Sequence, residues 1–320
     1  MKRLHNLKIR ALVDLSYKKP FSFEKTFYHP SHFYTGLEYY DKKSYYMSLR
    51  YEKKIIGLKF YMNKYKLICE IYSTTKISSI FKENIINEIS QRFSLKKDYN
   101  IFYHKYSTDK FLKNSIKRNY GRHISTMYSL YESLIISTFL QNTTVQRSIK
   151  MCKNMMENYG ERIKYDGVIL NCFWDIDDFY PEESELRALK LGYRAKNIMR
   201  ITEFFKNNNI NDEELRKLET NLLVKNLLKI YGVGKQTIFY ILLGQFHVTS
   251  YLKHIPLWER KILSYFIFKK ALIEEDELVT WFNIKYESWA GFSLSLVMED
   301  IFHQHKRKPL GWLKKILGEE

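Results

Sequence analysis

The clearest chemical signal in the sequence is a pair of glycines between two apolar helical segments, within TNLLVKNLLKIYGVGKQTIFYILLG at residues 220–244. Gly232 and Gly234 flank Val233, and because glycine tolerates positive φ, this spacing predicts a very tight turn between two helices. The backbone N–H groups of such a turn point outward with no side chain over them, a geometry that binds a phosphate oxygen. Lys235 adds positive charge beside them. The alternative is an ordinary corner between two helices.

The distribution of charge also favours a polyanionic partner. The formal net charge is +18, with 25 Lys and Arg against 10 Asp and Glu in residues 1–120, but 28 against 25 in residues 121–320. Neutralising phosphates with basic side chains releases counterions, so a basic region beside a near-neutral one is typical of nucleic-acid binding. AT-rich codon usage, which enriches Lys, Asn, Ile and Tyr, is the compositional alternative.

Length and composition exclude several classes of protein. The 320 residues suggest two domains, and 12 Gly and 5 Pro are too few for a disordered or collagen-like chain. No apolar run approaches the roughly 18 residues of a membrane span. The N-terminal MKRLHNLKIRALVDL carries charges where a signal peptide needs an apolar stretch. We therefore expect an intracellular protein, cytoplasmic or associated with the nucleoid, with no membrane contact.

The hydrophobic pattern predicts an α+β fold. Residues 44–73 are rich in β-forming residues and break near residues 52–54 and 63–64, as a small antiparallel meander does, and residues 22–33 predict a further strand. We expect a basic, β-rich N-terminal domain at residues 1–118 and a mostly α-helical domain at residues 119–320.

From about residue 80 the period becomes helical, starting with Ile80, Ile85, Ile86, Ile89 and Phe93. The tail at residues 303–315, HQHKRKPLGWLKK, predicts a basic surface segment. Between these two regions, breakers such as Gly160, Pro181 and Gly192 separate short amphipathic helices, which we expect at about 108–118, 129–140, 144–159, 183–190, 193–207, 212–218, 220–230, 235–244 and 257–270.

Four motifs in order resemble the helix-hairpin-helix DNA glycosylase superfamily, in particular its AlkA-like and 8-oxoguanine-glycosylase-like branches. EISQRFSLKKD at residues 88–98 resembles the end of the family's N-terminal domain, and YGRHISTMYSLYESLIISTFLQNTTV at 120–145 resembles the segment that follows. LKLGYRAKNI at 189–198 matches a Gly-Tyr-Arg-Ala-Lys segment, and GVGKQT within 230–243 resembles the alkylpurine branch's hairpin. The likeness spans about residues 20–305.

The resemblance implies an enzyme that flips a damaged base out of duplex DNA and cuts its glycosidic bond. Gln141 and Asn142 then occupy the place from which family members insert a wedge side chain into the vacated stack; a simple polar loop is the alternative. The hairpin and Arg194 are expected to contact DNA. Glu132 is expected to be a structural hydrogen-bonding residue. The expected DNA-binding residues are Tyr231, Gly232, Val233, Gly234, Lys235, Thr237, Gln141, Asn142 and Arg194.

The catalytic positions depart from the family pattern. Bifunctional members carry a lysine where this chain has Gln236, and an amide cannot form their Schiff base, so hydrolysis without lyase activity is expected. The family's usual aspartate is replaced here by Pro256 or Trp258, depending on the register. Glu259 is the nearest acid, and we expect it to be the catalytic carboxylate; a solvated Glu259 paired with Lys261 or Arg260 is the alternative.

These features predict a base-excision repair enzyme that removes an alkylated or oxidised purine and acts as a monomer on double-stranded DNA. The alternatives are a catalytically degenerate relative that binds or senses DNA without cutting it, and an RNA-binding helical protein. We expect no side-chain metal site and no cofactor beyond a monovalent cation held by hairpin carbonyls. The three cysteines, Cys69, Cys152 and Cys172, lack the spacing of a [4Fe–4S] ligand set or a disulfide framework.

Overall fold

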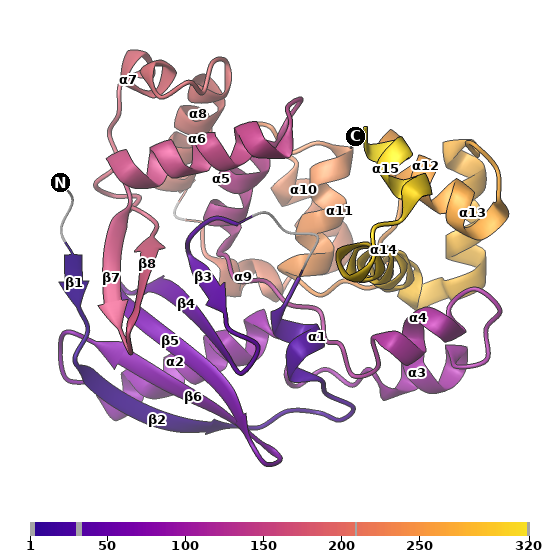
Figure 1. Ribbon diagram of the computed structural model, residues 1–320. Helices are drawn as coiled ribbons and strands as arrows, with labels where there is room; N and C mark the ends of the chain where they lie inside the picture. The colour runs from indigo at the N-terminus through magenta and orange to yellow at the C-terminus, as the bar shows by residue number, and fades with distance from the viewer. Residues whose placement is uncertain (1–3, 30–33, 209, 319–320) are drawn as a thin grey trace. The chain divides into compact units, whose positions relative to one another are not determined.

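The computed structural model describes residues 4–29, 34–208 and 210–318 (Figure 1). Its contacts divide the chain into two compact units, and each unit combines three separate segments. The predicted domain boundary between residues 118 and 119 divides the chain once along the sequence, which differs from this division into units, and it stays a prediction. The first unit comprises Met1–Tyr17, Phe33–Lys96 and Thr126–Gly232, and the second comprises Lys18–His32, Lys97–Ser125 and Val233–Glu320.

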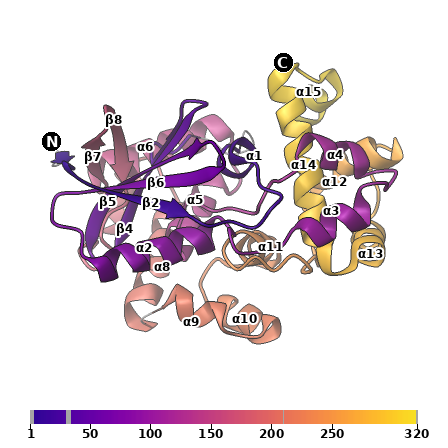
Figure 2. The same ribbon diagram turned by 90° about the horizontal axis from the view of Figure 1, so that it is seen from below.

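The first unit contains a five-stranded antiparallel sheet in the order β2-β6-β5-β4-β3. The predicted meander at residues 44–73 is confirmed as three of these strands. Its turns fall at Glu52-Lys53 and Lys64, which adopt positive φ. Helix α2, Ser79–Arg92, packs against this sheet (Figure 2). The strands are β2 Ile9–Leu15, β3 Glu38–Tyr40, β4 Ser44–Tyr51, β5 Lys54–Asn63 and β6 Lys66–Ser73.

A second, three-stranded sheet packs on β4 and β5, and this corrects the sequence prediction, which expected helices after residue 80. Strand β1 (Leu4–Asn6) pairs in parallel with β7 (Glu161–Tyr165), which forms a hairpin with β8 (Val168–Cys172). The Tyr165 hydroxyl donates to the carbonyls of Met47 and Leu58 in the larger sheet, 3.0 Å to each. Apolar side chains of both sheets form one core cluster.

The remaining helices of the first unit follow the predicted amphipathic segments closely. Helix α5 packs against α8 and α6, and α7 packs against α8 (Figure 1). A capping box fixes the start of α5, because Ser129 and Glu132 exchange side-chain and backbone hydrogen bonds. The helices are α5 Leu130–Leu140, α6 Val145–Asn158, α7 Glu183–Ala188, α8 Arg194–Asn208, α9 Asp212–Arg216 and α10 Thr220–Leu227.

The second unit is helical, and α14 packs against α4, α11 and α13 (Figures 1 and 2). Its core is aromatic and aliphatic, with Phe102, Phe282 and Phe292 fully buried. The unit contains α1 Phe23–Phe27, α3 Asn100–Tyr106, α4 Lys113–Arg118, α11 Lys235–Gly244, α12 Leu257–Leu263, the π-helix η1 Ser264–Phe268, α13 Glu275–Tyr286, the 3-10 helix η2 Glu287–Trp289, α14 Ala290–Arg307 and α15 Gly311–Leu317.

Two predictions about this unit were wrong. The predicted strand at residues 22–33 is helix α1, because Ser22 caps a helical turn by accepting from the Lys25 N–H; residues 30–33 of that prediction lie outside the described residues. The helix predicted from residue 108 starts at Lys113. Before it, the side chain of Asp109 accepts hydrogen bonds from the backbone N–H groups of Phe111 and Leu112. The basic tail at residues 303–315 lies largely at the surface, as predicted, and forms the end of α14 and the start of α15. None of the helices in the described chain has the length and apolar character needed to cross a bilayer.

Candidate functional site

Glu259, the predicted catalytic carboxylate, is buried in the first turn of α12. Only 3% of the surface of Glu259 is exposed to solvent. Oε1 accepts a hydrogen bond from the Tyr240 hydroxyl at 2.7 Å, whereas Oε2 has no hydrogen-bond partner among the described residues. Burial raises the pKa of Glu259 to about 7, against the opposing effect of the Tyr240 hydrogen bond. The solvated pairing with Lys261 or Arg260 is therefore wrong, because a side chain this buried cannot be solvated, and Glu259 is a carboxyl group that changes protonation near neutral pH.

Tyr240 connects this carboxyl to the second helix of the predicted hairpin. It lies on α11 and is 40% exposed, so the residue contacts both the buried carboxyl and solvent. Tyr240 follows Gln236 by four residues, and such residues lie on the same helix face. The backbone of Gln236 is in the first turn of α11, but its side chain lies outside the described residues. The structure thus brings Glu259 to the helix that holds the position of the family's lysine.

Neither residue in the family's aspartate register can supply a carboxylate. Pro256 is the N-cap residue of α12, and Trp258 is 41% exposed in its first turn. Ahead of them, His254 forms an ion pair with Glu275, whose Oε1 also accepts from the Ile255 N–H at 3.0 Å. These partners fix the segment that leads into α12.

The glycine turn is exposed, as its predicted role requires. Gly232 has φ of +80°, which glycine adopts without strain, and a Cβ added at Gly232 or Gly234 would meet no atom within 4 Å. Tyr231 and Lys235 are exposed, Thr237 is half-buried, and Val233 is buried. The division between the two units falls between residues 232 and 233, so the two sides of the turn belong to different units.

The predicted wedge residues lie in the turn between α5 and α6. Gln141 is the C-cap of α5, and Asn142 is exposed with φ of +45°. The start of α8 holds this turn through three side chains. Arg194 donates from Nη2 to the carbonyl of Gln141 and, at 3.4 Å, to that of Asn142. Tyr193 Oη donates to the Gln141 carbonyl and Asn197 Nδ2 to Gln141 Oε1, each at 3.5 Å.

Arg194 is buried and has a structural role within the protein. It is 3% exposed, and its Nε has no hydrogen-bond partner among the described residues. Its guanidinium also lies over the Tyr193 ring, 4.6 Å from the centroid. Arg194 therefore supports the turn that contains Gln141 and Asn142, which we call the wedge turn. A direct contact of Arg194 with DNA stays a prediction.

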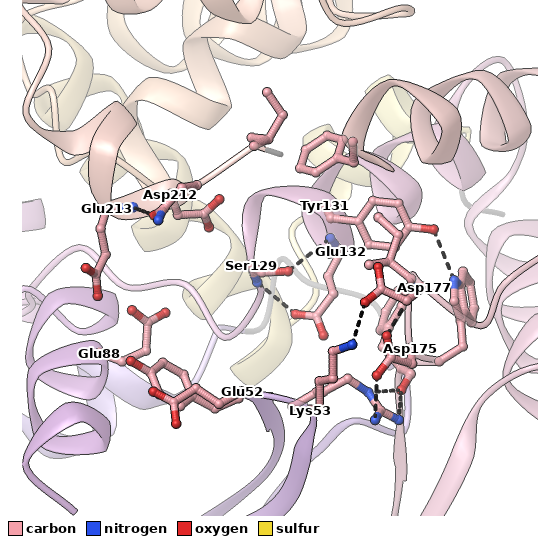
Figure 3. A pocket seen from close by; sticks show the side chains of 18 of the residues that line it. Glu52, Lys53, Glu88, Ser129, Tyr131, Glu132, Asp175, Asp177, Asp212 and Glu213 are labelled. Carbon is pink, nitrogen blue, oxygen red and sulfur yellow. Dashed lines mark hydrogen bonds and ion pairs between the residues drawn. The ribbon is translucent and has the colours of Figure 1, made fainter. Parts of the chain in front are cut away.

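A separate polar cavity of about 660 Å³ lies within the first unit, and none of the predicted catalytic or DNA-binding residues lines it (Figure 3). At its wall Glu88 accepts from Arg92 at 2.7 Å and from Arg216 at 3.1 Å. Burial alone would raise the pKa of Glu88, but the two guanidinium groups outweigh it and lower that pKa to about 2. Arg92 also donates to the Met127 carbonyl, which ties α2 to the segment before α5.

Further carboxylates in this cavity hold the N-terminus of α5. Glu132 accepts from the Ser129 N–H at 2.7 Å, which confirms its predicted structural role, and Asp212 accepts from the Leu130 N–H at 3.0 Å. Burial raises the pKa of both carboxyls. Each carboxylate thus has a partner inside the fold, and the described residues contain no cluster of three or more His, Cys, Asp or Glu that could hold a metal.

The sequence alone did not predict the role of Tyr240 or the hydrogen bonds from the start of α8 that hold the wedge turn. Tyr240 carries no motif signal of its own, although its spacing of four from Gln236 indicates a shared helix face. Tyr193, Arg194 and Asn197 fall within the 189–198 segment, whose glycine and basic residues carry the family resemblance. Their contact with Gln141 depends on how α8 packs against α5, which the sequence does not reveal.

No family model matches the chain. Among curated proteins, it is 23% identical over 199 residues to the DNA-3-methyladenine glycosylase of Bacillus subtilis, a match covering 60% of this chain and 64% of that protein. The matched part is thus just under two thirds of the relative's length.

Two solved structures resemble the chain over nearly its whole length. The 3-methyladenine DNA glycosylase from Archaeoglobus fulgidus has a TM-score of 0.72 at 16% identity, covering 92% of this chain and 99% of its own. The Clostridium acetobutylicum 8-oxoguanine glycosylase/lyase, in complex with double-stranded DNA containing cytosine opposite 8-oxoguanine, has a TM-score of 0.65 at 19% identity, covering 95% and 99%. The chain therefore shares the fold of these two DNA glycosylases, and the α+β fold that the sequence predicted is confirmed.

Proposed function

We propose that this protein is a DNA glycosylase that removes a damaged purine from duplex DNA by hydrolysis, acting as a monomer. The observation that carries the proposal is the buried Glu259 carboxyl, hydrogen-bonded to Tyr240 on the helix that begins at the glycine turn. The fold and the names of the similar proteins, which refer to 3-methyladenine or 8-oxoguanine, support the reaction class.

The chemistry needs an anion close to the sugar. When the C1′–N bond breaks, the base leaves with the bonding electrons and the sugar becomes an oxocarbenium-like cation. An ionised Glu259 stabilises that charge, orients the water that adds to C1′ and accepts the proton that this water loses as its oxygen bonds to C1′. Burial strengthens the charge interaction because solvent does not screen it. The polyanionic partner is supported by the net charge of +18.

N-alkylated purines are the substrate class that needs the least catalytic assistance from this site. They already carry positive charge, so the departing base leaves as a neutral molecule and the bond breaks with little help. Gln236 offers no amine, so no covalent Schiff-base intermediate forms there. Strand cleavage at the abasic product is accordingly left to alkali or to another enzyme.

The test is base release from a panel of labelled duplexes that contain 3-methyladenine, 7-methylguanine, 8-oxoguanine or no lesion. Alkali converts abasic products to strand breaks, and borohydride traps any covalent adduct. We expect breaks only after alkali, no adduct, and loss of release in Glu259→Gln. Binding without release from any duplex would instead support a DNA-binding protein without catalytic activity.

A further inference from the structure

One face of α8, together with Tyr193 directly before the helix, presents exposed polar and basic side chains along the first two turns. Tyr193, Lys196, Asn197 and Arg200 follow the spacing i, i+3, i+4 and i+7, which places them on one side of a helix. Tyr193, Lys196 and Arg200 are exposed and Asn197 is half-buried. The opposite side of the same turns is buried through Ala195, Ile198, Ile201 and Thr202. We call the exposed side the α8 face.

The α8 face links two predicted DNA-contact points of the first unit. At its start, Tyr193 and Asn197 hydrogen-bond to Gln141 in the wedge turn. At its far end, the Arg200 guanidinium lies over the Tyr231 ring, 4.4 Å from the centroid, beside the glycine turn. A guanidinium stacked on a ring keeps its N–H groups directed outward in its own plane, where they can donate to phosphate oxygens.

Charge and length of the α8 face fit one strand of DNA. Residues 193–200 contain no acidic residue, and the next one along the helix is the exposed Glu203, three residues after Arg200. Seven residues of α-helix span about 10 Å. A DNA strand rises ~3.4 Å per nucleotide, so the face matches roughly three nucleotides.

We propose that the α8 face binds the phosphate backbone of one DNA strand between the wedge turn and the glycine turn, with Lys196 and Arg200 each contacting a phosphate. This inference rests on the proposed function, because it takes duplex DNA as the partner. It gives these two residues a role in backbone binding, which positions the duplex without reading its sequence.

The experiment measures binding of Lys196→Ala, Arg200→Ala and the double variant to a labelled duplex with a tetrahydrofuran abasic-site analogue, by fluorescence anisotropy across a NaCl series. We expect the slope of log affinity against log salt to fall by about 0.9 for each phosphate that a variant no longer neutralises. At low salt, each single variant should bind about threefold to tenfold more weakly. Arg200→Lys should restore most of the slope but less of the affinity, because the stacked guanidinium is missing.

Lys206→Ala is the matched control. Lys206 lies on the same helix with its ammonium over the Tyr180 ring, 3.2 Å from the centroid, but donates to the Phe179 carbonyl on a different side of α8. The slope should not change in this variant, and thermal melting should show all variants folded. An unchanged slope in the double variant, while the wild type binds DNA and releases base, would overturn the α8 face alone. A wild type that binds no duplex would overturn the proposed function as well.

Discussion

Tyr240 and Glu259 lie 19 residues apart on consecutive helices of the second unit and meet through a 2.7 Å hydrogen bond from the phenol to a carboxyl group. The carboxyl is almost wholly buried and the tyrosine is 40% exposed. A carboxylate without a cation beside it is costly to bury, which is why the pKa of Glu259 rises to about 7. Such a costly group points to a catalytic use.

Replacing Glu259 by glutamine should separate activity from stability. The amide keeps the shape but cannot carry the anion, so base release should fall by roughly 10²–10³-fold. Because the folded pKa exceeds the unfolded value of 4.5, ionising Glu259 destabilises the fold as pH rises from about 4.5 to 7. At pH 8 the Gln variant should therefore be more stable than the wild type, by up to about 3 kcal/mol.

Single-turnover rates and urea unfolding at pH 8 measure the two effects. Glu157→Gln is a suitable control, since Glu157 is an exposed partner of Lys153 on α6. A Glu259 variant that releases base at the wild-type rate would show that the carboxyl is not catalytic.

The rate of base release should depend on pH through Glu259. If the reaction needs the carboxylate, the rate falls as pH drops through about 7. Tyr240→Phe removes the hydrogen bond that favours the ionised form, so the pKa of Glu259 should rise and the pH profile should move to higher pH. Rates of the two proteins between pH 5.5 and 9.5 measure this, and an unshifted profile in Tyr240→Phe contradicts the role given to the tyrosine.

How far the sequence predicts the site depends on the range of the contact. The tight turn at Gly232 and Gly234 is local, and its exposure follows from glycine spacing. Glu259 was identified by its position after the hairpin, but its burial and its contact with Tyr240 depend on how α11 and α12 pack. Arg92 follows Glu88 by four residues on one helix, whereas Arg216 reaches the same carboxylate from 128 residues away.

The fold shows the same division between local and distant causes. The meander at residues 44–73 was predictable, because its turns interrupt a run of β-forming residues. The β7–β8 hairpin also carries a local signal: Asp166-Gly167 is a preferred hairpin turn, and both residues have positive φ. The parallel pairing of β1 with β7 joins residues more than 150 positions apart, and no local pattern predicts it.

Alanine substitutions at three glycines should show whether the turn receives a phosphate. Gly234 has φ of −111° and open space at its Cβ position, so Gly234→Ala should fold with a loss of about 1 kcal/mol or less. A methyl group there would lie over the exposed amides and should weaken duplex binding about tenfold or more. Gly232→Ala should also lose stability, because alanine is strained at φ of +80°.

Gly244→Ala is the control for that series, since Gly244 ends the same helix and also has open space around it. Its DNA affinity should equal that of the wild type in anisotropy titrations. Wild-type affinity in Gly234→Ala would mean that the turn contacts no phosphate.

Removing Arg194 should loosen the wedge turn. Arg194→Ala deletes the donors to the Gln141 and Asn142 carbonyls, so the amides of residues 142–144 should exchange hydrogen faster. Misplacing the wedge should slow base release by on the order of tenfold to a hundredfold. Arg187→Ala on α7, which breaks only an exposed pair with Glu183, should change neither measurement. Unchanged exchange in Arg194→Ala would contradict its supporting role.

Glu88 should make the first unit sensitive to acid. Its folded pKa of about 2 lies below the unfolded value of 4.5, so its ionisation contributes stability above about pH 4.5 that is lost as pH falls toward 2. Glu88→Gln leaves Arg92, which is 4% exposed, without a carboxylate and should cost roughly 2–4 kcal/mol at pH 7. The difference from wild type should shrink between pH 4.5 and 2.5, because Glu88 is protonated in the unfolded wild type below pH 4.5 and its ionisation then contributes less to folding. Urea unfolding at several pH values tests this, and hydrogen exchange should localise the loss to α2 and the start of α5. A variant as stable as the wild type at pH 7 would show that the two arginines gain nothing from this carboxylate.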